Sequence, residues 1–254
     1  MVPSRSTLAL LPAVWVSLLL LTSRADAILL LNSGDPSQNT TAPGAGYAGS
    51  GWQHQGYFGN FLATIISPHH IITAQHIGIG NGTFVHDALF NGTGTVSYNI
   101  NTLANGGLGY WNIPNSDLRI YEVNGTFSSW ATLADSAAAE TGEIVMFGRG
   151  GVRGDDVYLS SELRGYELGA SDGVARWGTN MLENGVILDG AGRQLLRADF
   201  DGDSGIHEAH FSVGDSGGGT FVFHEGQWKL VGINYAVDGF YDTNNVTGDS
   251  SHFS

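Results

Sequence analysis

The sequence predicts an all-β protein, because three of its features favour many short strands joined by tight turns. Glycine makes up 38 of the 254 residues, roughly twice its usual share of about 7%. Short apolar runs rich in β-favouring residues, such as Phe61 to Ile66, end at turn-forming residues. Neither a long amphipathic helix nor an internal repeat is visible. Together these features indicate a sandwich or barrel architecture.

The clearest strand candidates lie in the first half of the chain. The run Phe61 to Ile66 is stopped by Ser67-Pro68 and resumes at Ile71 to Thr73, which predicts a hairpin. Leu118 to Val123 alternates apolar and polar side chains, as a half-buried strand does. Asn-Gly dipeptides favour hairpin turns, and four of them follow one another here, beginning at Asn81, Asn91, Asn105 and Asn124.

A domain boundary is expected near residue 130. Ser128 to Gly142 is alanine-rich and flanked by turn residues, and both a short helix and a connecting loop remain open for it. We therefore expect an N-terminal unit, residues 28–130, and a C-terminal unit, residues 131–254. The strand candidates of the second unit are Glu143 to Phe147, Leu195 to Phe200, Thr220 to Phe223 and Trp228 to Val237.

Residues 1–27 are typical of a signal peptide. Arg5 supplies a positive charge, Leu8 to Leu21 is apolar, and Ala25-Asp26-Ala27 offers small residues at a cleavage site. The apolar stretch is short for a membrane span, which needs about 20 residues. We expect a secreted protein, extracellular or periplasmic, that has no membrane association once the signal is removed. A membrane anchor is the alternative.

Charge and cysteine content exclude several classes of function. The formal net charge of −14 argues against non-specific nucleic-acid binding, which needs a basic face. Without cysteine the chain has no thiol nucleophile and no Cys-ligated zinc or iron–sulfur site. A chain of this length can bury a sufficient core without disulfides, and we expect a monomer.

Three short segments carry residues suited to nucleophilic catalysis. They contain His76, Asp117 and Ser216. A hydroxyl is a weak nucleophile at neutral pH, so Ser216 needs a base such as His76, whose tautomer a buried carboxylate, Asp117, can fix. Glycines around Ser216 permit a tight turn, in which the N–H groups of Gly214 and Ser216 can converge as an oxyanion hole.

These segments resemble the trypsin/chymotrypsin family of serine proteases. Thr73-Ala74-Gln75-His76 is similar to the family's Thr-Ala-Ala-His, and Asp117-Leu118 to the start of its Asp-Ile-Ala-Leu. Gly214 to Gly218 reads Gly-Asp-Ser-Gly-Gly, as in the family. The order His, Asp, Ser also matches. The resemblance implies two antiparallel six-stranded β-barrels with the active site in the cleft between them.

The same resemblance implies further residue roles. His210, six residues before Ser216, stands at the base of the specificity pocket, where trypsin has an aspartate, so cleavage after Arg or Lys is not expected. Val237 or a neighbour stands where a glycine keeps that pocket open. A surface position for His210 is the alternative. Removal of the signal would expose Ile28, whose amine could pair with Asp215 and order the oxyanion hole; a simple extended arm is the other interpretation.

The C-terminus departs from the family pattern. Family members end in a helix after the last strand, whereas the polar, turn-like residues 238–254 follow here. Two explanations remain open: the chain is a fragment, or its second barrel is incomplete and truncated.

Other motifs are weaker. Gly202-Asp203-Ser204-Gly205 repeats part of the nucleophile motif but lacks its second glycine. Asp199, Asp201 and Asp203 alternate as in calcium loops, without the EF-hand glycine and glutamate, so a structural calcium ion and a solvated acidic loop both remain open. His207-Glu208-Ala209-His210 is one residue short of the zincin motif. No metal or organic cofactor is required by triad chemistry.

The expected function is therefore that of a secreted serine endopeptidase acting on polypeptides through an acyl-enzyme. In this scheme His76, Asp117 and Ser216 form the triad. A non-catalytic binding protein on the same fold and an esterase with the same triad are the alternatives.

Overall fold

The computed structural model describes residues 28–135, 142–159, 161–183, 185–201, 205–237 and 250–252. These residues form an all-β protein in which every strand pair is antiparallel. Over those ranges the single α-helix is the short α1, Ala88–Asn91. None of their helices is long and apolar enough to cross a membrane. The predicted signal peptide, residues 1–27, lies outside them.

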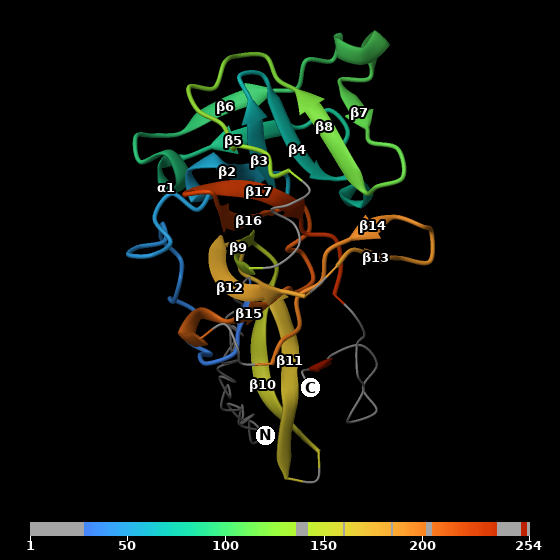
Figure 1. Cartoon of the computed structure of the whole chain (residues 1–254). Helices are drawn as coiled ribbons and strands as arrows, with labels where there is room; N and C mark the ends of the chain where they lie inside the picture. The colour runs from blue at the N-terminus through green and yellow to red at the C-terminus, as the bar shows by residue number, and fades with distance from the viewer. Residues whose placement is uncertain are drawn as a thin grey trace, which may run out of the picture.

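The N-terminal half is one seven-stranded sheet with the order β6-β5-β2-β3-β4-β8-β7 (Figure 1). The sheet curls until the residues just beyond β6 and β8, Ile100 and Val123, form an antiparallel bridge. The predicted hairpin is confirmed as β3 and β4, and the predicted strand after Asp117 as β8. The bounds are β2 Gln55–Phe58, β3 Phe61–Ser67, β4 His70–Ala74, β5 Thr83–His86, β6 Val96–Asn99, β7 Tyr110–Asn112 and β8 Leu118–Glu122.

The C-terminal half is built on a four-stranded sheet with the order β12-β9-β16-β17. A long hairpin, β10-β11, projects away from it, with β18 on its edge (Figure 1). The bounds are β9 Gly142–Gly148, β10 Gly151–Leu159, β11 Glu162–Ser171, β12 Arg176–Leu182, β16 Gly219–His224, β17 Gln227–Ile233 and β18 Ser250–His252.

Smaller elements connect these sheets. Two-stranded pairs join β1 to β15 and β13 to β14. Their bounds are β1 Leu29–Leu30, β13 Ile187–Leu188, β14 Gln194–Leu195 and β15 Ala209–His210. The short 3-10 turns are η1 Trp52–His54, η2 Gln75–Ile77, η3 Ala104–Gly107 and η4 Gly205–His207.

Several predicted elements differ from the structure. The predicted strand Leu195 to Phe200 keeps only its first residue in a strand, and the strand predicted to reach Val237 ends at Ile233. None of the four Asn-Gly pairs named above makes a two-residue hairpin turn; Asn91-Gly92, for example, ends α1. Two six-stranded barrels are not confirmed, because one curled seven-stranded sheet and one four-stranded sheet with a projecting hairpin are observed.

Three apolar clusters form the core of the protein. One lies inside the N-terminal sheet, around Phe58, Ile65 and Tyr121. A second contains residues of both halves, among them Leu62 of β3 and Phe221 of β16, so the two sheets share a continuous core. The third fills the C-terminal half and includes Ile28 and Leu30 with Ile144, Met146 and Val222.

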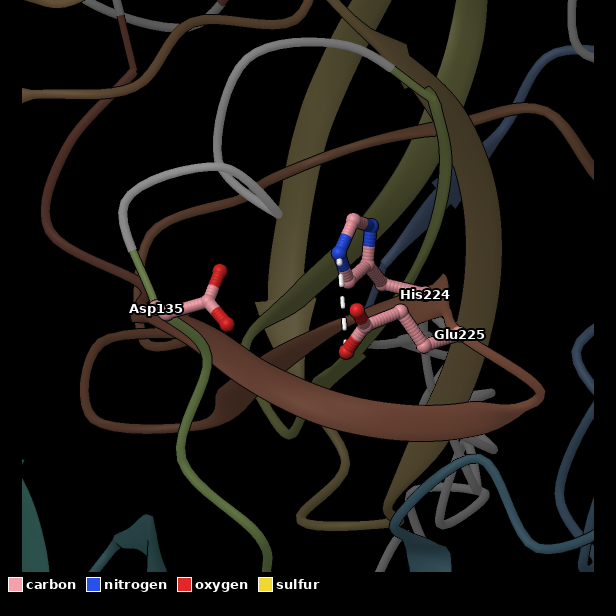
Figure 2. A group of neighbouring side chains, drawn as sticks. All are labelled: Asp135, His224 and Glu225. Carbon is pink, nitrogen blue, oxygen red and sulfur yellow. Dashed lines mark ion pairs between the residues drawn. The ribbon is translucent and has the colours of Figure 1, made fainter.

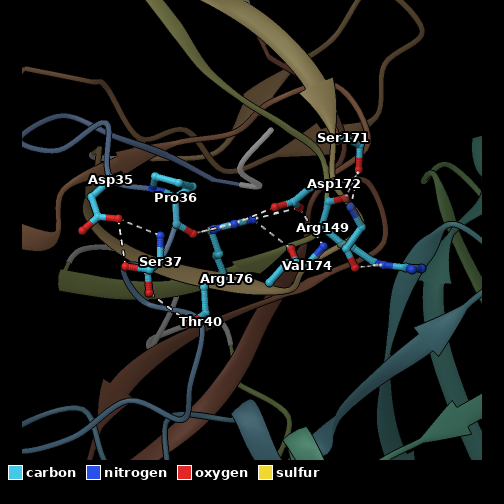
Figure 3. Close-up of polar contacts among 10 residues, drawn as sticks. Asp35, Pro36, Ser37, Thr40, Arg149, Ser171, Asp172, Val174 and Arg176 are labelled. Atoms are coloured by element: carbon cyan, nitrogen blue, oxygen red, sulfur yellow. Dashed lines mark hydrogen bonds and ion pairs between the residues drawn. The ribbon is translucent and has the colours of Figure 1, made fainter. Parts of the chain in front are cut away.

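The chain after residue 27 therefore packs on the C-terminal half, although the predicted boundary grouped it with the N-terminal unit. Leu29 and Leu30 pair with β15. Further along, Arg176, 2% exposed, donates two hydrogen bonds to the carbonyl oxygen of Pro36 and pairs with Asp172 at 2.8 Å. Figure 3 shows this guanidinium between the two partners. Because a buried arginine needs such partners, this network fixes the arm against β12.

Candidate active site

The structure brings His76, Asp117 and Ser216 into one line of hydrogen bonds. Nδ1 of His76 lies 2.5 Å from Oδ2 of Asp117, and Nε2 of His76 lies 2.8 Å from Oγ of Ser216. The Asp117 side chain is 8% exposed and the imidazole 39%. A buried carboxylate that accepts from Nδ1–H leaves Nε2 free to accept the serine proton. The arrangement can activate a hydroxyl by general-base catalysis.

Pairing between β4 and β8 positions the first two of these residues. Ala74 at the end of β4 faces Leu118 at the start of β8, so the residues that follow and precede them meet at the same sheet edge. There the backbone N–H of Gln75 donates to the carbonyl oxygen of Asp117 at 2.5 Å, and the N–H of His76 donates to Asp117 Oδ1 at 3.1 Å. The carboxylate is thus held by both the backbone and the imidazole.

Ser216 lies on a tight turn that packs against the N-terminal sheet. Gly217 has φ +86°, and a Cβ there would overlap Thr73 Oγ1 and the Leu62 carbonyl oxygen. Its N–H donates to the carbonyl oxygen of Asn234 at 3.0 Å. Only glycine allows both this backbone conformation and so close an approach of the turn to β3 and β4. The glycine after Ser216 therefore lets the turn carry Ser216 within reach of His76.

The predicted oxyanion-hole amides belong to the same turn. Gly214 has φ +100°, and its Cα faces the backbone of Gly150. Among the residues that the structure describes, no hydrogen bond occupies the N–H groups of Gly214 and Ser216. Both amides therefore remain available to an oxygen that develops negative charge.

Asp215 is buried beneath this turn, 1% exposed. Its carboxylate accepts from the N–H groups of Gly150 at 2.6 Å, Ser212 at 2.7 Å and Ile28 at 3.3 Å. Burial raises the pKa of Asp215 to about 6, in opposition to these hydrogen bonds. The structure thus brings together Ile28 and Asp215, the pair expected from the sequence.

Two cavities lie beside the triad, one lined in part by Ser216 and the other in part by Asp117. The smaller, about 230 Å³, is lined by residues 211–216 and 234–237 and includes Val237. His210 lines the neighbouring cavity of about 670 Å³ instead. It is half-buried, its ring contacts Phe200 at 5.4 Å between centroids, and burial lowers its pKa. His210 is therefore half-buried beside the larger cavity, and it is not among the residues that line the smaller one.

The weaker motifs of the 199–210 region lie mostly apart from the triad. Asp199 pairs with Arg197 at 3.2 Å, and Asp201 is exposed, whereas Asp203 and Ser204 lie outside the described residues. His207 packs its ring against Trp177. The calcium prediction accordingly stays a prediction.

A group of possible metal ligands that sequence reasoning missed lies elsewhere: Asp135, His224 and Glu225 (Figure 2). Their ligand atoms are all within 4.8 Å of one another. Lys229 Nζ already lies 2.8 Å from Glu225 and 3.6 Å from Asp135. An ammonium therefore takes the place where a cation would bind these carboxylates.

Two further residues, which lie outside the three triad segments, stand beside the triad. The Tyr235 ring meets the His76 ring edge-on at 5.7 Å, and Arg193 Nη1 lies 3.8 Å from Asp117 Oδ1. Neither belongs to a motif, because only the folded chain brings them to His76 and Asp117.

No protein-family model matches the chain, and no curated protein is similar to it.

Proposed function

We propose that this protein is a serine endopeptidase with a mechanism like that of the trypsin/chymotrypsin family. The observation that carries the proposal is the line of hydrogen bonds from Asp117 through His76 to Ser216. The proposal draws support from a cavity beside Ser216 and from two amides with no hydrogen-bond partner among the described residues.

The reaction would proceed in two halves. Ser216 Oγ attacks the scissile carbonyl carbon while His76 Nε2 takes its proton, and the new oxyanion accepts from the N–H groups of Gly214 and Ser216. His76 then gives that proton to the leaving amine, which leaves an acyl-serine. A water molecule, deprotonated by His76, attacks the acyl carbon, and the serine oxygen regains its proton as the acid product leaves.

The smaller cavity favours substrates with an uncharged side chain at the scissile bond. Its carboxylate, Asp215, already accepts hydrogen bonds from three backbone amides, and the other lining residues, such as Phe211 and Val213, are neutral. A basic side chain would find no free counter-charge there. Residues 1–27 direct the protein to secretion in this proposal, and Ile28 then becomes its N-terminus.

The proposal is tested by labelling the purified protein that begins at Ile28 with a fluorophosphonate and mapping the adduct by peptide mass spectrometry. We expect the label on Ser216 and its loss in Ser216→Ala, whereas Ser204→Ala should label as the unmodified protein does. Absence of labelling would indicate a binding protein on this fold. Digestion of a peptide library then separates an endopeptidase from an esterase, which would cleave only activated esters.

A further inference from the structure

Arg193 joins a hairpin of the C-terminal half to the triad carboxylate of the N-terminal half. It lies between β13 and β14, and its Nη1 is 3.8 Å from Asp117 Oδ1. In Figure 1 this hairpin lies beside the lower ends of β4 and β8. In the chain, His76 follows β4 by two residues and Asp117 directly precedes β8. The guanidinium side chain is 27% exposed and the carboxylate 8%, so solvent screens their interaction only in part.

The hairpin holds this guanidinium in place. Asp189 Oδ1 accepts from the backbone N–H of Arg193 at 2.9 Å, and Asp189 Oδ2 from its Nε at 2.6 Å. The guanidinium also stacks over the Tyr235 ring, 4.7 Å from its centroid, and donates to the Tyr235 hydroxyl. The backbone N–H of Arg193 leads the interactions that lower the pKa of Asp189. With three contacts besides Asp117, the guanidinium of Arg193 is fixed relative to that carboxylate.

We propose that Arg193 is a positioning residue that sets the charge balance of the triad, so that His76 acts as a base at lower pH than it otherwise would. This inference rests on the proposed hydrolase function. A carboxylate stabilises the imidazolium form of a histidine beside it. A guanidinium on the other oxygen of that carboxylate offsets part of this stabilisation, and it also restricts the carboxylate to one orientation toward Nδ1.

Five charged or titratable groups surround the contact between Arg193 and Asp117, and the sign of each charge determines its effect on His76. They are Asp117 and His76 from the N-terminal half, and Asp189, Arg193 and Tyr235 from the C-terminal half. Removal of Arg193 takes away one positive charge, so the negative charges of Asp117 and Asp189 act on His76 without it. The variant Arg193→Gln should therefore stabilise the imidazolium, and the double variant Arg193→Gln/Asp189→Asn, which also loses the negative charge of Asp189, should do so by less.

The test is the pH dependence of fluorophosphonate inactivation, measured as a second-order rate constant between pH 4 and 9. We expect the acid limb of the Arg193→Gln profile to move to higher pH by about half a unit or more, and that of the double variant to move in the same direction by less. The matched control is Arg197→Gln, which removes an equal charge from an exposed ion pair with Asp199 and should leave the acid limb in place.

A second readout does not depend on activity. NMR titration of the His76 imidazole in a Ser216→Ala background should give midpoints in the same order as the acid limbs. The midpoint should be highest in Arg193→Gln, lower in the double variant and lowest in the protein that keeps Arg193. Equal midpoints in a well-folded Arg193→Gln protein would overturn the inference, as would a double variant that returns to the original profile, since the shift would then come from unpaired Asp189. Absence of labelling in the unmodified protein would instead overturn the proposed function, while the titration would still decide the role of Arg193.

Discussion

The backbone nitrogen of Ile28 lies 3.3 Å from Oδ2 of Asp215, although 187 positions separate the two residues. Ile28 is 1% exposed and has φ +58°, a conformation that β-branched residues rarely adopt. While a residue precedes Ile28, this nitrogen offers Asp215 one neutral N–H. Cleavage after Ala27 would turn it into an ammonium with three donors and would remove the φ constraint altogether.

The first prediction concerns that cleavage. A protein that begins at Ile28 should be active, and one that keeps a single additional residue before Ile28 should lose about 100-fold or more in kcat/KM. The physical reason is that an uncharged amide stabilises a buried carboxylate less than an ammonium does, so the turn from Gly214 to Ser216 is less well ordered. Peptide hydrolysis by the two forms checks this, and an acetylated Ile28 protein is the control, since it lacks the charge without the extra residue. Equal activity of all three would contradict it.

The second prediction is a pH dependence of stability. In the chain that keeps a residue before Ile28, the pKa of Asp215 is raised to about 6 from an ordinary 3.8. The folded state then binds more protons than the unfolded state between those values, so this group favours folding most below about pH 4. That contribution is lost as pH rises to about 6, by roughly 3 kcal/mol.

Urea unfolding between pH 4 and 7 measures this effect as the difference between the extended chain and its Asp215→Asn variant, whose amide does not titrate. We expect the aspartate chain to lose stability relative to the variant as pH rises. In the protein that begins at Ile28 the loss should be absent or reversed, because the ammonium favours the charged carboxylate. The prediction is contradicted if, in the chain that keeps a residue before Ile28, the difference in unfolding free energy between the aspartate protein and Asp215→Asn does not change with pH.

Much of the site follows from local sequence, because local geometry builds it. Two local features require glycine at position 217: its φ is positive, and a Cβ there would overlap Thr73. The segments of β3 and β4 are short apolar runs and that of β8 alternates apolar and polar residues, and the pairing of β4 with β8 places His76 next to Asp117. Local patterns therefore predict the turn that carries Ser216 and the strands beside His76, whereas the choice of Asp117 rests on the family resemblance.

The rest depends on contacts that no local pattern encodes. The hairpin β10-β11 has glycine, aspartate and arginine in its strands, Gly151–Leu159 for example, and so lacks the apolar alternation on which strand prediction relies. The run after Leu195 has that alternation, but only its first residue finds a partner strand. Arg193 has no signature at all, since its role arises where the hairpin meets Asp117.

The third prediction concerns the group formed by Asp135, His224 and Glu225. Because Lys229 Nζ contacts both carboxylates and its side chain is 6% exposed, added Zn²⁺ should change the unfolding temperature of the unmodified protein by less than about 1 °C. Lys229→Gln removes the ammonium from between the two carboxylates, so we expect Zn²⁺ to stabilise that variant by several degrees. Differential scanning fluorimetry with and without EDTA measures both, and Lys229→Gln/His224→Ala is the control that should lose the response. A large Zn²⁺ effect on the unmodified protein would contradict the expected role of Lys229.

The fourth prediction compares two glycines with similar backbones and different surroundings. Gly217 has φ +86° and faces Thr73 Oγ1 and the Leu62 carbonyl oxygen, whereas Gly226, in the turn from β16 to β17, has φ +79° and nothing within 4 Å of its Cβ position. Gly226→Ala should cost only backbone strain, about 1 kcal/mol, and leave fluorophosphonate labelling of Ser216 unchanged.

Gly217→Ala should cause the same backbone strain and a second effect. Its Cβ must either overlap β3 and β4 or push the turn away from them. We expect a loss of about 3 kcal/mol in the free energy of unfolding and a fall of at least about 100-fold in the labelling rate, because a displacement of about 1 Å at a nucleophile has that effect. Urea unfolding separates the two consequences, since labelling is measured where both variants are fully folded. Equal labelling rates for the two variants under those conditions would show that contact between the turn and the N-terminal sheet does not position Ser216.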